Sequence, residues 1–313
     1  MDYSNLLNKA WALSWKYKIL WVLGFFAAAM GYAGGAENVL IQKSDSFNFN
    51  FDNGILEGIG DWFQYNPEVS IALVIFFVGM VMLLLLIIFI LNLISVAGLI
   101  QGVYQIERNE NIRLSQLFRA GASYFWRFLG LFFIAGIVIF AFVILIIVIN
   151  VIAFAIAAPL GILSILISIP IGIFGLFFIE NLYSLTQREI VTNQAAVFQS
   201  IGEAYNLLIK HLGPNFVIFL IQMLIGIAIF IGALIILMIF AAPIIIMAAY
   251  SPWILLASLA IIIPLLLLIS IFVEGFFGTF TESLMTLFYL ELRKLTPRQI
   301  IPPSPGPAPM PQA

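Results

Sequence analysis

Long apolar runs separated by short polar segments dominate the chain and predict helices that cross a membrane. A helix needs about 20 apolar residues to cross about 30 Å of hydrocarbon. Segments that meet this requirement are 19–36, 70–104, 128–158, 160–187, 215–243 and 253–291. We therefore expect an all-α fold, a polytopic transmembrane helical bundle with six spans.

A stretch with both polar and apolar faces leads into each odd-numbered span. We expect 3–18, 114–127 and 197–210 to form three cytoplasmic amphipathic interfacial helices, because their apolar residues recur at helical spacing. Their apolar stripes, which include Leu117 and Leu208, face either the lipid headgroups or the projecting ends of the even-numbered spans. Residues typical of a membrane interface are Trp11, Trp15, Lys16, Lys18, Trp126, Arg127 and Lys210.

The order of amphipathic helix, span and span predicts an internal threefold repeat. Matching stretches in the even-numbered spans are FILNLISV, FIENLYSL and FTESLMTL, and the repeats cover about 1–105, 106–190 and 191–292. A second register, which aligns Pro170 and Glu180 with Pro264 and Glu274, remains open. Residues 1–292 would form a single integral membrane domain.

Basic residues predict the orientation of this domain, because they favour cytoplasmic loops. With six spans, one side of the membrane holds every one of the 13 basic residues except Lys43. That side is expected to be cytoplasmic and to hold both termini, which leaves the loop 37–68 outside. Residues 293–313 are rich in proline and are expected to form a disordered cytoplasmic tail.

The composition excludes several classes of protein. Apolar residues make up 63% of the chain and charged residues 9%, which excludes a water-soluble enzyme. A net charge of −2 excludes nucleic-acid binding. The absence of cysteine and a single histidine, His211, exclude thiolate chemistry and histidine-built metal sites, and we expect no cofactor.

Polar side chains inside the apolar spans form the candidate site, because carboxylates there are costly and mark function by default. In one interpretation they line a polar axis that binds a proton, a cation or a lipid amine. In the other they point into cytoplasmic water or pair with Arg188, Arg127 or Lys210 and so fix the packing. The candidate residues are Glu180, Glu274, Glu282, Asn92 and Asn181.

Three stretches resemble a known family: EAYNLLIKHLGPNFVIFL, RAGASYFWRFLGLFF and the ending TLFYLELR. The family is the membrane domain attached to some glycerophosphoryl diester phosphodiesterases, with the related stand-alone prokaryotic membrane proteins of unknown function. Tyr289, Glu291, Leu292 and Arg293 match its tyrosine–acid–leucine–arginine ending. The resemblance implies a prokaryotic plasma membrane. It does not imply phosphodiesterase activity, because a chain with His211 alone lacks the histidines of that catalytic barrel.

These patterns favour a non-enzymatic multi-pass plasma-membrane protein. The leading hypothesis is a scaffold or accessory domain that engages inner-leaflet membrane lipids or a membrane-protein partner. The alternative is a small transporter or lipid-handling protein that uses the intramembrane carboxylates. A continuous polar cavity that reaches Glu274 would favour transport, whereas a bundle filled with side chains would favour the scaffold.

Single-cysteine variants test the orientation, since the chain has no cysteine of its own. Ser46→Cys, in the expected outer loop, should react with a membrane-impermeant thiol reagent added to intact cells. Ser304→Cys, in the expected cytoplasmic tail, should react only after the cells are lysed. The reverse labelling pattern would contradict the orientation.

Overall fold

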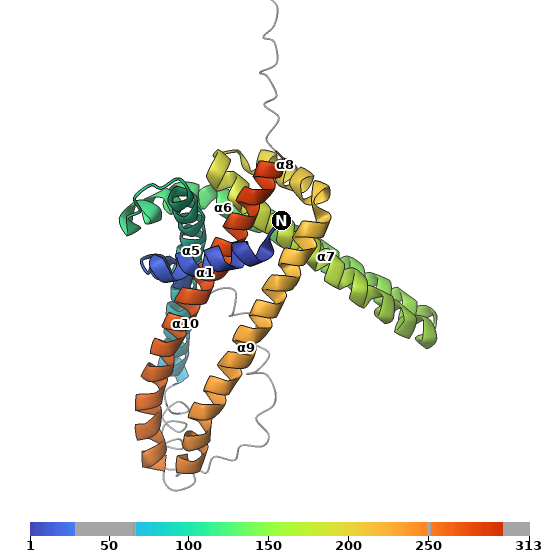
Figure 1. Cartoon of the computed structure of the whole chain (residues 1–313). Coiled ribbons are helices and arrows are strands. Elements are labelled where there is room, and N and C mark those ends of the chain that lie inside the picture. The colour runs from blue at the N-terminus through green and yellow to red at the C-terminus, as the bar shows by residue number, and fades with distance from the viewer. Residues whose placement is uncertain (29–64, 66, 249–251, 297–313) are drawn as a thin grey trace, which may run out of the picture.

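The computed structural model describes residues 1–28, 65, 67–248 and 252–296 (Figure 1). Of these residues, 93% lie in helices and none lies in a strand, so the predicted all-α class is confirmed. The helices are α1 (Tyr3–Lys16), α2 (Leu20–Ala28), α5 (Pro67–Glu107), α6 (Leu114–Ile156), α7 (Ala158–Asn193), α8 (Val197–Lys210), α9 (Leu212–Ala248) and α10 (Pro252–Leu295).

Among the described residues, five helices are long and apolar enough to cross a membrane. They lie within α5, α6, α7, α9 and α10, and they give the chain the character of a multi-pass membrane protein. The sixth predicted span, 19–36, begins with α2, but 29–36 lie outside the described residues. The six-span count and the threefold repeat therefore stay predictions, and most of the loop 37–68 also lies outside the described part.

The ends of two predicted segments differ from the structure. The amphipathic stretch 114–127 is continuous with the following span in α6, because no proline interrupts the helix from Leu114 to Ile156. Helix α10 continues to Leu295, beyond the predicted start of the tail at 293. The reason is that Arg293 pairs with Glu189 and Glu203 and so holds the last turn of α10 against its neighbours.

The helices converge at one end of the molecule, which we call the head. The head consists of α1, α8 and the adjoining ends of α5, α6, α7, α9 and α10. From it the α6–α7 pair extends in one direction and the α9–α10 pair in another (Figure 1). The N-terminus and the C-terminal end of α10 both lie in the head, since α1 packs against α10.

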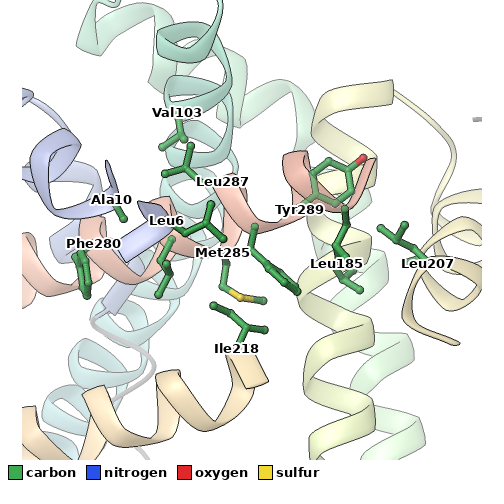
Figure 2. Packing of buried hydrophobic residues seen from close by; sticks show 14 of the residues in the cluster. Leu6, Ala10, Val103, Leu185, Leu207, Ile218, Phe280, Met285, Leu287 and Tyr289 are labelled. Carbon is green, nitrogen blue, oxygen red and sulfur yellow. The ribbon is translucent and has the colours of Figure 1, made fainter. Parts of the chain in front are cut away.

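Leucines of the apolar stripes predicted from the sequence are buried in the head. Figure 2 shows Leu6 and Ala10 of α1 beside Leu287 of α10, in a cluster that also contains Leu208. Leu117 is fully buried in a neighbouring cluster. Burial of each such leucine contributes about 1.5–3 kcal/mol. Of the two alternatives left open by the sequence, Leu117 and Leu208 thus follow the one in which the stripes pack on the protein's own helices.

Helix α2 lies against α10 through small residues. A Cβ atom built on Gly24 would lie 2.3 Å from the backbone oxygen of Gly275 and 2.3 Å from Oγ1 of Thr279. The Thr279 hydroxyl donates to the carbonyl oxygen of Leu20 at 3.0 Å across the same contact. Small residues allow two helix backbones to approach this closely in a membrane.

Gly24→Ala should therefore lower the thermal unfolding midpoint, because the added methyl group forces α2 away from α10. Overpacking of this kind costs about 1–3 kcal/mol. Gly79→Ala is the matched control, since a Cβ there meets no described atom within 4 Å. Circular dichroism of the purified variants in detergent measures both midpoints, and equal midpoints would contradict the close approach.

Candidate functional site

Polar side chains from several helices meet at one cavity, which we call the polar cavity. Its volume is about 720 Å³, and residues of α2, α5, α7, α9 and α10 line it. It lies where α7 and α9 leave the head in different directions (Figure 1). Its polar lining includes Asn92, Glu180, Asn181, Arg188, Gln222 and Glu282.

The structure brings together four of the five candidate residues predicted from the sequence. Asn92, Glu180, Asn181 and Glu282 all line the polar cavity. Glu274 does not, and lies on a second, mainly apolar cavity between α9 and α10. The polar axis imagined through all three glutamates is therefore divided between two cavities.

A buried ion pair forms one wall of the polar cavity and connects α7 with α10. The Arg188 side chain is 1% exposed, and its Nη2 donates to Oε2 of Glu282 at 2.6 Å. Its Nη1 donates to the carbonyl oxygen of Ser184 at 2.7 Å and to the Ser184 hydroxyl at 2.8 Å. Glu282 thus follows the structural interpretation of the candidate acids, in which they pair with a basic residue and fix the packing.

Glu180 lies on the same face of α7 as Ser184 and Arg188, because residues four apart are neighbours on a helix. Its side chain is exposed and lines the polar cavity. Within the described chain it has neither a hydrogen-bond partner nor an ion-pair partner. Since Glu282 and Arg188 neutralise each other, the charged groups of the lining sum to −1, and that charge belongs to Glu180.

The two candidate asparagines contribute differently to the cavity wall. Asn92 donates to the carbonyl oxygens of Phe26 and Ala27 at 2.9 and 2.8 Å and so connects α5 to the end of α2. Asn181 donates to the carbonyl oxygen of Phe177, but its buried Oδ1 has no hydrogen-bond partner among the described residues. Buried polar atoms are rarely left unpaired, so Asn181 offers an acceptor to a bound group.

A second polar cluster joins the C-terminal ends of α7 and α10 to α8. Arg293 pairs with the buried Glu189 and lies 3.3 Å from the carboxylate of Glu203. The Tyr289 hydroxyl lies 3.0 Å from the hydroxyl of Thr192. The sequence analysis did not single out Glu189. The signal that could have found it is Arg293, because a cation at the end of an apolar helix needs a carboxylate partner.

The predicted interfacial residues lie around the head. Trp11, Trp15 and Trp126 are exposed, as a lipid-facing side chain would be. Arg127 has a protein contact as well, because its Nη1 donates to the carbonyl oxygen of Gln194 at 2.9 Å. The lysines of the set, Lys16, Lys18 and Lys210, are also exposed.

The polar cavity offers hydrogen-bond acceptors to a ligand, and its described residues do not form a metal site. In the described part of the chain, no group of three or more His, Cys, Asp or Glu side chains could hold a metal ion. A comparison of the chain with family models, curated proteins and solved structures finds no match. The resemblance to the phosphodiesterase membrane domains stays a prediction, and function has to follow from the cavity.

Glu282→Gln should destabilise the protein more than the double variant Arg188→Met/Glu282→Gln does. The single change leaves a buried guanidinium without its counter-charge, which costs on the order of 3–5 kcal/mol, whereas the double change removes both charges. Thermal midpoints of the purified variants in detergent compare the two.

Glu291→Gln is the matched control for this pair. Glu291 pairs with the exposed Lys294, and such surface pairs contribute about 0–1 kcal/mol. The midpoint of this variant should stay close to that of the unchanged protein. A double variant that melts at the same temperature as Glu282→Gln would argue against a stabilising pair.

Proposed function

We propose that this chain is a non-enzymatic lipid-handling protein of a prokaryotic plasma membrane. The polar cavity does not reach Glu274, the feature that would favour a transporter, so the proposal is limited to lipid handling. The polar cavity takes the amine-bearing headgroup of an amphipathic ligand, and Glu180 binds the amine. The observation that carries the proposal is the carboxylate of Glu180, which has no partner among the described residues and lies beside the neutral Arg188–Glu282 pair.

The size and lining of the polar cavity support this function. A volume of about 720 Å³ falls within the range of about 300–1,000 Å³ that is typical of ligand sites. Such sites combine an apolar lining with a few placed polar groups. Here Phe219 and Met223 supply apolar surface, while Glu180 and Oδ1 of Asn181 supply acceptors for an ammonium group.

The directions of the helices support access from the membrane. Helix α7 leaves the head away from α9 and α10, and the polar cavity lies at this divergence (Figure 1). A lipid headgroup would then enter between α7 and α9 while its chains stay in hydrocarbon. Because α1 and the end of α10 share the head, they lie on one side of the membrane, and the excess of basic residues there favours the cytoplasmic side.

The scaffold hypothesis has less support. Much of the apolar stripe of α1 packs in the core of the head, whereas α8 buries Leu208 but keeps Phe198 and Tyr205 exposed. The exposed rings of Trp126 and Phe198, with exposed fractions of 77% and 79%, remain available for such contacts. They account for membrane contact at the head but leave the polar cavity without a role.

Two variants test the proposal in nanodiscs that contain phosphatidylglycerol and a small fraction of phosphatidylethanolamine. Glu180→Gln removes the acceptor charge. Gly226→Leu fills the polar cavity, since Gly226 lines it and a Cβ there meets no described atom within 4 Å. Both should reduce the phosphatidylethanolamine retained by the protein in native mass spectrometry by about tenfold or more. Glu180→Gln does so because a charged hydrogen bond is lost, and Gly226→Leu because its side chain takes the space of the headgroup.

Gly232→Leu is the matched control, because Gly232 lies on the same helix, has equal space and lines the other cavity. It should retain phosphatidylethanolamine to within about twofold of the unchanged protein, because Gly232 lies six residues, or about 9 Å, along α9 from Gly226 and does not line the polar cavity. Unchanged retention in both Glu180→Gln and Gly226→Leu would refute the proposed function.

A further inference from the structure

A second cavity, which we call the apolar cavity, lies between α9 and α10 beside α1. Its volume is about 600 Å³. Trp11 of α1 forms part of its wall, and aliphatic and aromatic side chains of α9 and α10 form most of the rest. Ile225 and Ile229 of α9 line both this cavity and the polar cavity, so the two are neighbours separated by α9.

One carboxylate interrupts this apolar lining. Glu274 is the one charged side chain among the described residues of the wall, and it is partly buried. Across the described residues it has no hydrogen-bond partner and no ion-pair partner. A carboxylate inside an apolar span is costly unless a positive group compensates it.

Aromatic rings gather on the same wall. Phe277 and Phe280 line the apolar cavity together with Trp11, whose ring centroid lies 5.7 Å from that of Phe280. Trp11 also packs edge-on against Phe276, with 4.9 Å between the centroids. Faces of aromatic rings attract cations, and tryptophan does so most strongly.

We infer that the apolar cavity is a binding site for a lipophilic monocation, with the positive group next to Glu274 and the apolar groups among the side chains of α9 and α10. The charge of the wall excludes an anion. A neutral hydrocarbon chain would leave Glu274 uncompensated, and a metal ion would find one carboxylate and few other oxygen ligands. This site is separate from the polar cavity and does not depend on the function proposed for it.

The test uses radiolabelled tetraphenylphosphonium and the full chain, purified in a neutral maltoside detergent. Equilibrium dialysis should show saturable binding to the unchanged protein. Glu274→Gln should weaken the affinity by about tenfold or more, because it removes the counter-charge. Gly232→Leu should weaken it similarly by filling the cavity, since a Cβ at Gly232 meets no described atom within 4 Å.

The variants of the polar cavity are the controls. Glu180→Gln and Gly226→Leu should bind tetraphenylphosphonium to within about twofold of the unchanged protein. These two variants could bind tetraphenylphosphonium normally and also retain phosphatidylethanolamine normally. That result would refute the function proposed for the polar cavity and would leave the cation site in the apolar cavity supported. Thermal midpoints of all four variants show that the fold is kept.

Competition identifies the source of the natural cation. Displacement of tetraphenylphosphonium by a long-chain alkylamine that partitions into lipid would indicate a membrane cation, whereas displacement by a short, soluble alkylamine alone would indicate a soluble lipophilic cation. Either result supports the site. Affinity that is unchanged in both Glu274→Gln and Gly232→Leu, or equal competition by the uncharged triphenylphosphine oxide, would overturn it.

Discussion

A guanidinium buried between apolar helices is the constraint on which the head depends. Arg188 is 1% exposed, and a charge in such a place costs several kcal/mol unless it is paired and hydrogen-bonded. Glu282 therefore has to lie beside it, and this requirement fixes the position of α10 along α7. Tyr289 and Arg293 follow on the same face of α10, where they meet Thr192 and Glu189 of α7. The C-terminal turns of the two helices are thus joined by polar contacts at successive levels.

The divergence of α7 and α10 beyond this contact accompanies two separate cavities (Figure 1). Glu180 and Glu274 each lie eight residues before their member of the pair, or about 12 Å along the helix. Because the two helices leave the head in different directions, these two carboxylates do not face a shared space. The structure places them on different cavities, with Ile225 and Ile229 of α9 between the two.

The sequence predicts the elements of this fold better than their contacts, because hydropathy and periodicity are local properties. Apolar length alone located the five described spans, and the helical spacing around Leu117 and Leu208 showed that one face is buried. Neither pattern says which surface covers that face. The contact of Gly24 with Gly275 was missed for the same reason, since it joins two helices rather than two positions of one. Polarity within the spans marked the residues of the polar cavity, but the separation of Glu274 depends on how α9 and α10 pack.

The four intramembrane or buried glutamates of α7 and α10 fall into two groups: two pair with an arginine of the described chain and two do not. Glu282 is compensated by Arg188, and Glu189 by Arg293, so both add to the packing of the head. In the described structure, nothing of opposite charge compensates Glu180 or Glu274, although each lines a cavity. Uncompensated carboxylates lower the stability of a membrane helix, and proteins break such local rules mainly where function requires it. The contrast within one chain, between glutamates that stabilise and glutamates that do not, is therefore the physical reason to assign ligands to both cavities.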